Sequence, residues 1–374
     1  MDLASFDTSI SLEADPLGSA IMPERRRGRG ANSNKSGRYE SLARYAEDDG
    51  WGSIEALAPF RTHVTVDKAK SIITRNDSPD ISFDRSVNPY RGCEHGCVYC
   101  FARPTHAFMG LSPGLDFESQ LFVKPGAAAL LEQELAARSY EPKTIAMGTN
   151  TDPYQPIERQ WKVTRSILEV LERAQHPVGI VTKSALVTRD IDILARMAAK
   201  GLAKVALSVT TLDPKLSRSL EPRASAPHRR LEAIRQLVDA GIPTTVMVAP
   251  IIPAVNDTEI ERILDAASAA GAREAGYVLL RLPLEVRDLM IDWLKEHRPE
   301  ALGRVMSLVR STRGGKDYDS AFGKRMTGVG PYAWMIGRRF ETATARLGLN
   351  AARVKLRTDL FRRPARVGEQ LELL

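Results

Sequence analysis

The sequence predicts an α/β fold built on a parallel sheet. Between residues 86 and 298, short β-branched or apolar runs alternate with stretches whose apolar residues recur about every 3.6 positions. Gly201, Gly241 and Gly271 follow three of the helical stretches, where a left-handed cap favours glycine. Continuous apolar strands separated by helices indicate parallel pairing with right-handed crossovers. We therefore expect six β/α units.

The strand-like runs lie at residues 144–148, 178–182, 204–210, 244–250 and 277–282, with one more strand expected before Cys93. The helical stretches cover residues 127–138, 163–174, 190–200, 229–240, 259–270 and 284–296. In β/α barrels the chemistry lies on loops after the carboxyl ends of the strands. Polar residues directly after these runs are therefore the first candidates for a site.

Three regions are expected along the chain. Residues 1–58 form a polar, partly disordered N-terminal extension that contains "ERRRGRGANSNKSGR", a composition too poor in apolar residues to order itself alone. This extension is either an arm that contacts nucleic acid, a cap on the barrel or a solubilising tail. Residues 59–300 form the core domain, whose lead-in includes the extended piece "THVTVD", and residues 301–374 form a basic, mainly helical C-terminal extension.

All three cysteines of the chain, Cys93, Cys97 and Cys100, lie in "NPYRGCEHGCVYC". An odd number at such tight spacing does not suit disulfides, so ligation of a metal or cluster is the natural interpretation. Three thiolates would leave one corner of a cubane iron–sulfur cluster open to a small molecule. The rival is a structural zinc site with His95 as fourth ligand, although the spacing departs from the usual zinc patterns.

The C-x3-C-x2-C spacing, with Tyr99 before the last cysteine, resembles the signature of the radical SAM superfamily. The longer run "NPYRGCEHGCVYCFARPTHAF" resembles the spore photoproduct lyase-related branch, often labelled DNA repair photolyase, and the resemblance covers roughly residues 80–285. It implies a partial (β/α)6 barrel, open on one side. It also implies a [4Fe-4S] cluster and S-adenosylmethionine (AdoMet) on the open iron, cleaved on reduction to methionine and a 5′-deoxyadenosyl radical that abstracts hydrogen. A flavodoxin or ferredoxin type of electron donor follows from the same resemblance.

The segment "GTNTDPYQPIE" follows the second strand, where radical SAM enzymes often bind the amino group of the cofactor through a glycine-rich stretch. Here polar residues replace the second glycine. The resemblance implies cofactor contacts from this segment, and glycine would let the backbone approach a ligand closely. The alternative is an Asx-type turn before Pro153. The candidate residues are Gly148, Thr149, Asn150, Thr151 and Asp152.

Three further cofactor contacts are expected after later strands. Lys183 corresponds to a lysine that contacts the cofactor in lyase-like relatives, and Ser208 is implied at the ribose or methionyl end. Lys183 could instead extend to water and Ser208 bond its own backbone. Arg223 is suited to a bidentate grip on the methionyl carboxylate, or else forms a local ion pair with Glu221.

Ile251 or Ile252, in the loop after the fifth strand, is expected against adenine, and Tyr99 joins the cofactor-binding candidates. Asn256 and Asp257 are most simply interpreted as an N-cap of the next helix.

No catalytic residue is assigned. His106 follows the cysteines and is interpreted as packed, with a substrate-facing role as the alternative. The resemblance implies that true spore photoproduct lyases use a downstream cysteine as hydrogen donor, which this chain lacks after Cys100. Tyr154 or Tyr277 is a possible substitute.

The charge of +7 is uneven, since residues 301–374 hold fifteen Lys/Arg and six Asp/Glu, giving +9, and the rest −2. This makes nucleic acid a candidate partner, with Arg338, Arg339, Arg362 and Arg363 as paired cations; solvated helix faces are the alternative.

No run spans a bilayer and "MDLASFDTSISLEAD" lacks signal-peptide features, so a cytoplasmic protein without a membrane partner is expected. The leading function is a radical SAM enzyme acting on nucleic acid or nucleotides. A non-enzymatic iron–sulfur or zinc protein that binds nucleic acid or senses redox state is the alternative.

Overall fold

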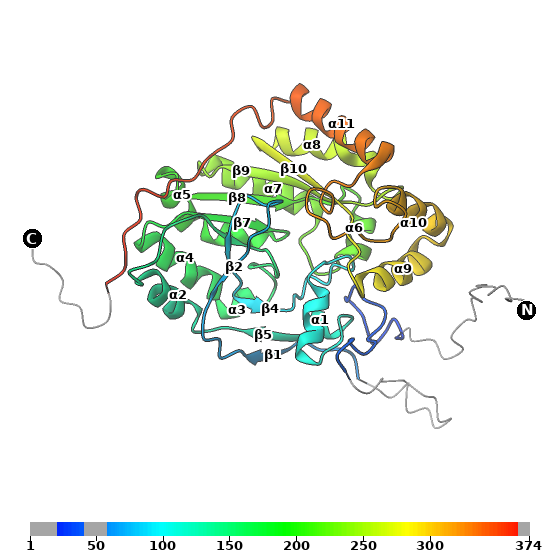
Figure 1. The fold of residues 1–374 in the computed structure, drawn as a ribbon, viewed down its shortest axis with the longest axis horizontal. Helices are drawn as coiled ribbons and strands as arrows, with labels where there is room; N and C mark the ends of the chain where they lie inside the picture. The colour runs from blue at the N-terminus through cyan, green and yellow to red at the C-terminus, as the bar shows by residue number, and fades with distance from the viewer. Residues whose placement is uncertain (1–20, 41–57, 366–374) are drawn as a thin grey trace, which may run out of the picture.

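The computed structural model describes residues 21–40 and 58–365, and its centre is a seven-stranded sheet in the order β10-β9-β8-β7-β6-β3-β2 (Figure 1). Every neighbouring pair from β3 to β10 is parallel, and β2 adds an antiparallel edge strand. In the described part of the chain the two end strands, β10 and β2, do not pair with each other, so the sheet is open on one side as expected. The strands are β2 (Ile73–Arg75), β3 (Arg85–Val87), β6 (Ile145–Met147), β7 (Val178–Thr182), β8 (Ala203–Ser208), β9 (Thr244–Ile251) and β10 (Glu274–Leu279).

Helices cover the outside of this sheet and agree with the predicted stretches to within a few residues (Figure 1). The helices on the sheet are α2 (Ala127–Leu135), α4 (Val163–Arg173), α5 (Ile191–Ala199), α7 (Pro227–Asp239) and α8 (Ile260–Ala269), whereas α9 (Val286–His297) packs against α10 (Leu302–Ser311). Short helices α3 (Glu158–Trp161) and α6 (Pro214–Leu220) precede α4 and α7 and were not predicted. The expected alternation of strands and helices in an α/β fold is confirmed.

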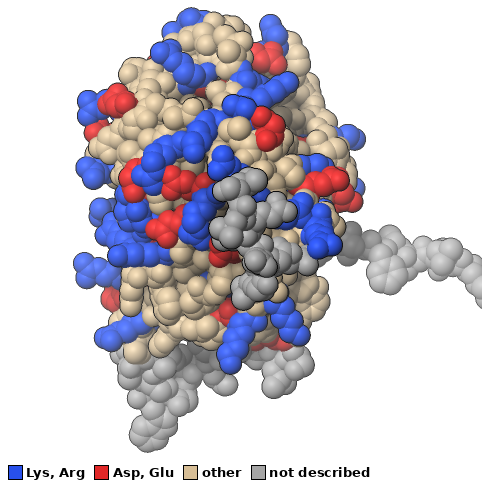
Figure 2. Space-filling model, turned by 90° about the vertical axis from the view of Figure 1, so that its left-hand side faces the viewer, with Lys and Arg blue, Asp and Glu red and all other residues tan. Residues whose placement is uncertain are grey.

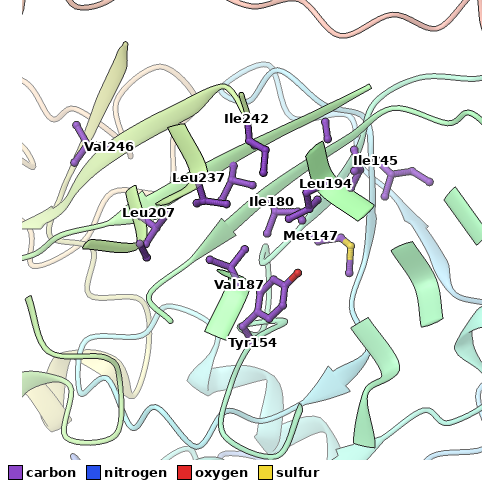
Figure 3. Packing of buried hydrophobic residues seen from close by; sticks show 14 of the residues in the cluster. Ile145, Met147, Tyr154, Ile180, Val187, Leu194, Leu207, Leu237, Ile242 and Val246 are labelled. Atoms are coloured by element: carbon purple, nitrogen blue, oxygen red, sulfur yellow. The ribbon is translucent and has the colours of Figure 1, made fainter. Parts of the chain in front are cut away.

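The main core lies between the sheet and these helices. Ile145, Ile180 and Leu207 from three strands are buried with Leu194 of α5 and Leu237 of α7, as Figure 3 shows. Apolar residues of the helices recur on one side because a turn takes 3.6 residues, so each helix buries one stripe against the strands. This packing holds the strand ends in a fixed arrangement.

The prediction for the sixth strand is wrong in its position. The strand was expected at residues 277–282, but β10 ends at Leu279. Leu280 and Leu282 are buried beyond the strand, in a second core that includes Cys97 and Tyr99. The apolar run therefore continues past the strand because a second core requires it.

A second, three-stranded sheet was not predicted. Its central strand β5 (Gln120–Val123) pairs in parallel with β1 (His63–Val66) and antiparallel with β4 (Tyr90–Arg91). β1 confirms the extended lead-in, and β4 directly precedes the cysteines. A 3-10 helix, η1 (Arg103–Met109), and α1 (Asp116–Ser119) connect the cysteines to β5.

Both extensions pack on the core where they are described. Arg29, Ala31, Asn32 and Ser33 are buried, so this part of the N-terminal extension is a packed segment, closer to a cap than to a free arm. The expectations for residues 1–20 and 41–57 lie outside the described residues. Helices α10 (Leu302–Ser311) and α11 (Gly330–Arg346) follow the barrel, and α11 packs on α8 (Figure 1).

Residues 351–365 then run without helix or strand back to α4 and α5, where the backbone N–H of Arg362 donates to Ala174 O at 2.8 Å. In the described ranges no helix is long and apolar enough to cross a membrane.

Candidate functional site

The predicted polar residues lie at one edge of the large sheet, because parallel strands place their carboxyl ends together. The cysteines follow β3 and β4, the segment from Gly148 to Asp152 follows β6, Lys183 follows β7, and Ser208 ends β8. The candidate ligands and polar residues are therefore gathered at this one edge of the sheet.

The cysteine loop (residues 92–100) curls around two glycines. Gly92 and Gly96 have φ values of +73° and +68°, and a Cβ on Gly96 would lie 2.7 Å from a carboxylate oxygen of Glu118. Cys93 and Cys97 are buried, Cys100 is half-buried, and all three thiols are free. The loop therefore needs glycine at both positions to bring its thiols into the protein.

Burial raises the pKa of all three thiols, and the neighbouring thiols raise that of Cys93 further. Without a cation these groups are protonated, whereas a bound metal would convert them to thiolate ligands. In the described ranges no three His, Cys, Asp or Glu side chains are arranged for one metal ion, and His95 Nδ1 lies 3.3 Å from Asp152. Because a [4Fe-4S] cluster takes each thiolate on a different iron, this three-thiol set fits a cluster better than a zinc ion held also by His95.

Gln155 and Thr151 support the cysteine loop from behind. Gln155 Nε2 donates to Gly92 O at 3.1 Å, and its Oε1 accepts from Glu94 N at 2.9 Å. Thr151 Oγ1 donates to the same carbonyl at 2.8 Å. Thr151 was expected to contact the cofactor; in the structure it is buried and holds the loop. Gln155 was missed, although it lies in the same quoted segment.

Asp152 has the Asx-type turn given as the alternative, because its Oδ1 accepts from Tyr154 N at 2.9 Å. It also accepts from Thr182 Oγ1 at 2.7 Å and Lys183 N at 2.8 Å. Burial alone would raise the pKa of this carboxyl, but His95 and these donors together lower it. Asp152 therefore ties the ends of β6 and β7 together through a carboxylate that is only 10% exposed.

The other three residues of this segment contact protein neighbours. Gly148 has a φ of +90°, and a Cβ there would lie 1.9 Å from Val181 O, so the close approach to β7 already requires glycine. Asn150 N donates to Asn88 Oδ1 at 3.1 Å, and Thr149 lies 3.4 Å from the same amide. Both side chains are half-buried, and their role toward a cofactor stays a prediction.

Lys183 and Ser208 meet at the strand ends, as expected. Lys183 Nζ donates to Ser208 Oγ at 2.8 Å, to Thr210 Oγ1 at 3.1 Å and to Ala249 O at 3.0 Å. The lysine therefore does not extend freely to water, since β8, the residues just after it and β9 supply its acceptors.

Glu221 is the centre of a buried polar cluster that the sequence did not reveal. Its carboxylate accepts from Tyr99 OH and from Arg230, and it lies 3.2 Å from Lys183 Nζ. Burial opposes ionisation, yet the charges of Arg230 and Lys183 lower the pKa of Glu221. Tyr99, Lys183 and Ser208 thus lie in one buried network, and Tyr99 is held by its hydroxyl.

Arg223 does not pair with Glu221. Its Nη1 lies 3.0 Å from Glu94 Oε1, and 38% of its side chain is exposed. Its backbone N–H donates to His95 O at 3.2 Å, which places it directly over the cysteine loop. The alternative Arg223–Glu221 ion pair is wrong, because Arg230 pairs with the Glu221 carboxylate. The bidentate contact of Arg223 with the methionyl carboxylate of the cofactor stays a prediction.

The loop after β9 differs from expectation. Ile251 has no exposed surface and lies in the main core, while Ile252 packs in the second core with Cys97 and Tyr99. Asn256 occupies the N-cap position of the 3-10 helix η3 (Asp257–Glu259) before α8, but its side chain makes no capping bond. Its amide donates to Thr210 O at 2.7 Å and Pro250 O at 3.0 Å, and accepts from Ile252 N at 2.6 Å.

Asp257 is not a cap either, since it accepts from Tyr332 OH of α11. The Asn256 and Asp257 side chains therefore bond residues of other segments and do not cap a helix.

Tyr154 and Tyr277, the candidate hydrogen-transfer residues, belong to the main core or pack against it. Tyr277 packs on Phe340 of α11 with ring centroids 4.7 Å apart, on the outer side of the sheet. Tyr154 is fully buried beside Val187 (Figure 3). His106 is buried and donates through Nε2 to Gln120 O at 3.0 Å, in agreement with a packed role.

A segment far upstream completes the site. Residues 29–34, here called the docked segment, reach Glu118 through Gly30 N and Ala31 N, each at 2.8 Å. Arg103 also donates to Glu118, at 2.5 Å, and to Cys97 O at 2.9 Å. The docked segment is thereby linked to the cysteine loop through one buried ion pair.

Comparisons with known proteins agree with this geometry. A sequence profile described as "Radical SAM superfamily" matches residues 87–267. An uncharacterized protein of Mycobacterium tuberculosis is 38% identical over 232 residues, which cover 62% of this chain and 68% of that protein. An uncharacterized protein of Methanocaldococcus jannaschii is 29% identical over 192 residues, covering 51% of this chain and 69% of that protein.

Among solved structures, spore photoproduct lyase complexed with dinucleoside spore photoproduct is similar with a TM-score of 0.55 at 17% identity, over 76% of this chain and 80% of that chain. A mutant form of the same lyase gives a TM-score of 0.54 at 17% identity, over 76% of this chain and 80% of that chain. At such identity the likeness shows the fold alone, and it confirms the expected barrel type.

Proposed function

Because this chain belongs to the radical SAM superfamily, we propose that it binds a [4Fe-4S] cluster through Cys93, Cys97 and Cys100 and reductively cleaves AdoMet. The observation that carries the proposal is the set of three free, inward-facing thiols at the strand-end edge of an open parallel barrel. When bound, the cluster would supply the electron that cleaves AdoMet to methionine and a 5′-deoxyadenosyl radical.

The protein's own groups would orient the cofactor. Arg223 reaches over the cysteine loop and keeps much of its side chain exposed, so its remaining donors suit the methionyl carboxylate. Lys183 and Ser208 form a fixed polar wall at the ends of β7 and β8. Ile252, buried in the same core as Cys97 and Tyr99, supports the apolar side of the same site.

For the substrate we propose nucleic acid or a nucleotide. The fold is shared with a lyase whose structure contains a dinucleoside photoproduct, and the chain is basic. No cysteine follows Cys100, so hydrogen return cannot use a downstream thiol. The reaction is therefore expected to differ from a direct reversal of spore photoproduct in which a downstream cysteine donates the hydrogen.

We propose that the basic C-terminal region contributes to nucleic acid binding, but with fewer phosphate contacts than its number of arginines suggests. Arg338 lies 2.8 Å from Glu341, Arg339 lies 2.7 Å from Glu261, and Arg363 donates to Ala137 O. Figure 2 likewise shows Lys and Arg side chains interspersed with Asp and Glu on the face that it presents. Because these cations already have partners, removing Arg338 and Arg339 together is expected to lower the log–log salt slope of DNA binding by less than the ~2 of two free phosphate contacts.

The test of the main proposal is anaerobic reconstitution followed by reduction with AdoMet. About four iron and four sulfide per chain and formation of 5′-deoxyadenosine are expected. Replacing any one cysteine by Ala should abolish cleavage while the far-ultraviolet circular dichroism stays unchanged, because the ligands lie on a loop. Stoichiometric zinc without iron uptake, or iron without AdoMet cleavage, would favour the non-enzymatic alternative.

A further inference from the structure

Arg281, just beyond β10, has a guanidinium without an ion-pair partner among residues 21–40 and 58–365. Its Nη2 lies 3.3 Å from Tyr318 OH and its Nη1 lies 3.7 Å from Met326 Sδ, both weak contacts. Its Nε is buried and has no hydrogen-bond partner there. A guanidinium carries five N–H donors, so most of its binding capacity is unused.

The free N–H donors of Arg281 lie beside the cysteine loop. Its neighbours Leu280 and Leu282 pack in the same core as Cys97 and Tyr99, and Leu280 N donates to Ile251 O at 2.9 Å. The guanidinium carbon lies 4.9 Å from the ring centroid of Phe101, the residue after Cys100. Arg281 therefore belongs to the same edge of strand ends as the other site residues.

Phe101 is itself unusual, because 46% of this large apolar residue is exposed, although Cys100 before it is half-buried and Ala102 after it is buried. An exposed ring beside a polar site offers a stacking surface for another planar group. The Arg281 guanidinium lies over the Phe101 ring, so an anion-binding group and a partly exposed aromatic ring adjoin each other.

Arg313 adds positive charge from behind. It is buried and donates to Leu280 O at 2.9 Å and Lys324 O at 2.7 Å, which fixes the loop after α10 against the end of β10. Its Nε has no partner in the described ranges. Burial, and next the charge of Arg281, lower the pKa of Arg313, while Tyr318 and Asp319 act in the opposite direction. Two neighbouring cations, one of them buried, make this corner favourable for an anion.

We propose that Arg281 binds a phosphate of the substrate and that Phe101 stacks on an adjacent base, so that the substrate is a nucleotide unit within a nucleic acid strand. This inference rests on the proposed function and assigns its substrate side. A guanidinium matches a phosphate with two parallel hydrogen bonds, and base stacking on aromatic rings is the usual means of holding an unpaired strand. A simple carboxylate ligand would satisfy Arg281 but would leave the exposed ring of Phe101 unexplained.

Binding of a short fluorescein-labelled oligothymidylate to the anaerobically reconstituted full chain tests the proposal. Arg281→Ala should weaken affinity by about tenfold or more, as expected for loss of a charge-assisted bond. Phe101→Ala should weaken it by a similar factor through lost stacking. Arg281→Lys should give an intermediate loss. Arg235→Ala, which removes an exposed arginine paired with Glu232 on α7, is the matched control and should bind normally.

A second probe isolates the phosphate. The same strand with neutral methylphosphonate linkages should bind wild type more weakly than the phosphodiester strand, and Arg281→Ala should lose most of this preference. Equal affinity of wild type for both strands, no binding by wild type, or undiminished binding by either Arg281→Ala or Phe101→Ala would overturn the proposal.

Cleavage of AdoMet without substrate is measured on the same preparations. If wild type and Arg281→Ala both cleave AdoMet but bind the strand equally, the substrate assignment fails and the proposed function stands. If wild type does not cleave AdoMet, the proposed function fails, while the strand-binding data still decide whether Arg281 forms a phosphate site.

Discussion

At the residue scale, Glu118 joins three parts of the chain through one buried carboxylate. Its oxygens accept from Gly30, Ala31 and Arg103, and neither Glu118 nor Arg103 has exposed surface. Glu118→Gln removes the charge and leaves Arg103 buried without compensation. The free energy of unfolding should fall by about 3–5 kcal/mol in urea titrations.

The control for Glu118 is Glu232→Gln, which disrupts a pair with Arg235 on the exposed face of α7. Because solvent screens that pair, the control should unfold like wild type. Equal stability of all three proteins would show that the buried carboxylate contributes nothing beyond its shape.

His176 makes a pH-dependent contribution to stability. Its Nδ1–H donates to Pro177 O at 3.0 Å, so Nε2 accepts from Tyr140 OH at 2.7 Å. Burial lowers the pKa of this imidazole from 6.5 to about 4. Since the unfolded chain takes up the proton first, stability present above pH 6.5 should be lost as pH falls toward about 4, by up to ~3 kcal/mol.

His176→Gln keeps an acceptor for Tyr140 and removes the titration. Its unfolding free energy should therefore change less than that of wild type between pH 7 and pH 4, in denaturant titrations at each pH. His228→Gln, at an exposed position of α7, should retain the wild-type pH dependence. Parallel curves for wild type and His176→Gln would contradict the assigned tautomer and burial.

How much of the site was predictable can also be seen residue by residue. The cysteines, Lys183 and Ser208 were found because their motif and their place after strands are local in sequence. Glu221, Arg230 and Gln155 were missed because their partners come from distant segments, and one sequence does not indicate which acid faces which cation. Arg281 was missed because it fell inside a strand whose predicted end lay too far along the chain.

At the scale of elements, the docked segment is the largest departure from expectation. Its low apolar content suggested disorder, yet it is held by backbone N–H groups on Glu118 and by Arg29, whose Nη1 donates to Glu118 O at 2.6 Å. Composition measures what a segment can bury by itself, and here the binding energy comes from polar groups elsewhere. The small β1-β5-β4 sheet was missed for a different reason: its strands are short, and β1 pairs with β5, which lies more than 50 residues further along the chain.

Gly30 tests whether the docked segment shapes the cysteine loop. A Cβ at Gly30 would lie 1.8 Å from Gly96 O, so Gly30→Ala forces two backbones apart. The expected result is a loss of about 1–3 kcal/mol in unfolding free energy, together with fewer iron atoms retained per chain after reconstitution. Urea titration and iron quantification measure the two effects.

Gly126→Ala is the control for Gly30, because no atom lies within 4 Å of a Cβ placed at Gly126. It should retain wild-type stability and iron. If Gly30→Ala also retains full iron, the docked segment stabilises the fold without shaping the ligand loop.

At the scale of the whole molecule, the six β/α units were predictable because each unit has its own periodicity and stop signals. The way in which the open sheet is bridged was not, because it depends on two loops about 240 residues apart. Asp80 follows the edge strand β2, and it accepts from Gly323 N at 2.5 Å and Arg325 Nε at 2.6 Å. Those residues adjoin the other edge, since Leu279 N of β10 donates to Met326 O at 2.9 Å.

This bridge predicts that Asp80 stabilises the barrel as a unit. Only 6% of the Asp80 side chain and 19% of the Arg325 side chain are exposed, so water screens the pair weakly. Asp80→Ala should lower the free energy of unfolding by about 1–3 kcal/mol, because it leaves Arg325 and Gly323 N without their acceptor. Limited proteolysis should also cut the loop after α10 faster. Asp359→Ala, which breaks an exposed pair with Arg357, should change neither measurement, and an Asp80→Ala protein that behaves like this control would show that the sheet needs no bridge across its open side.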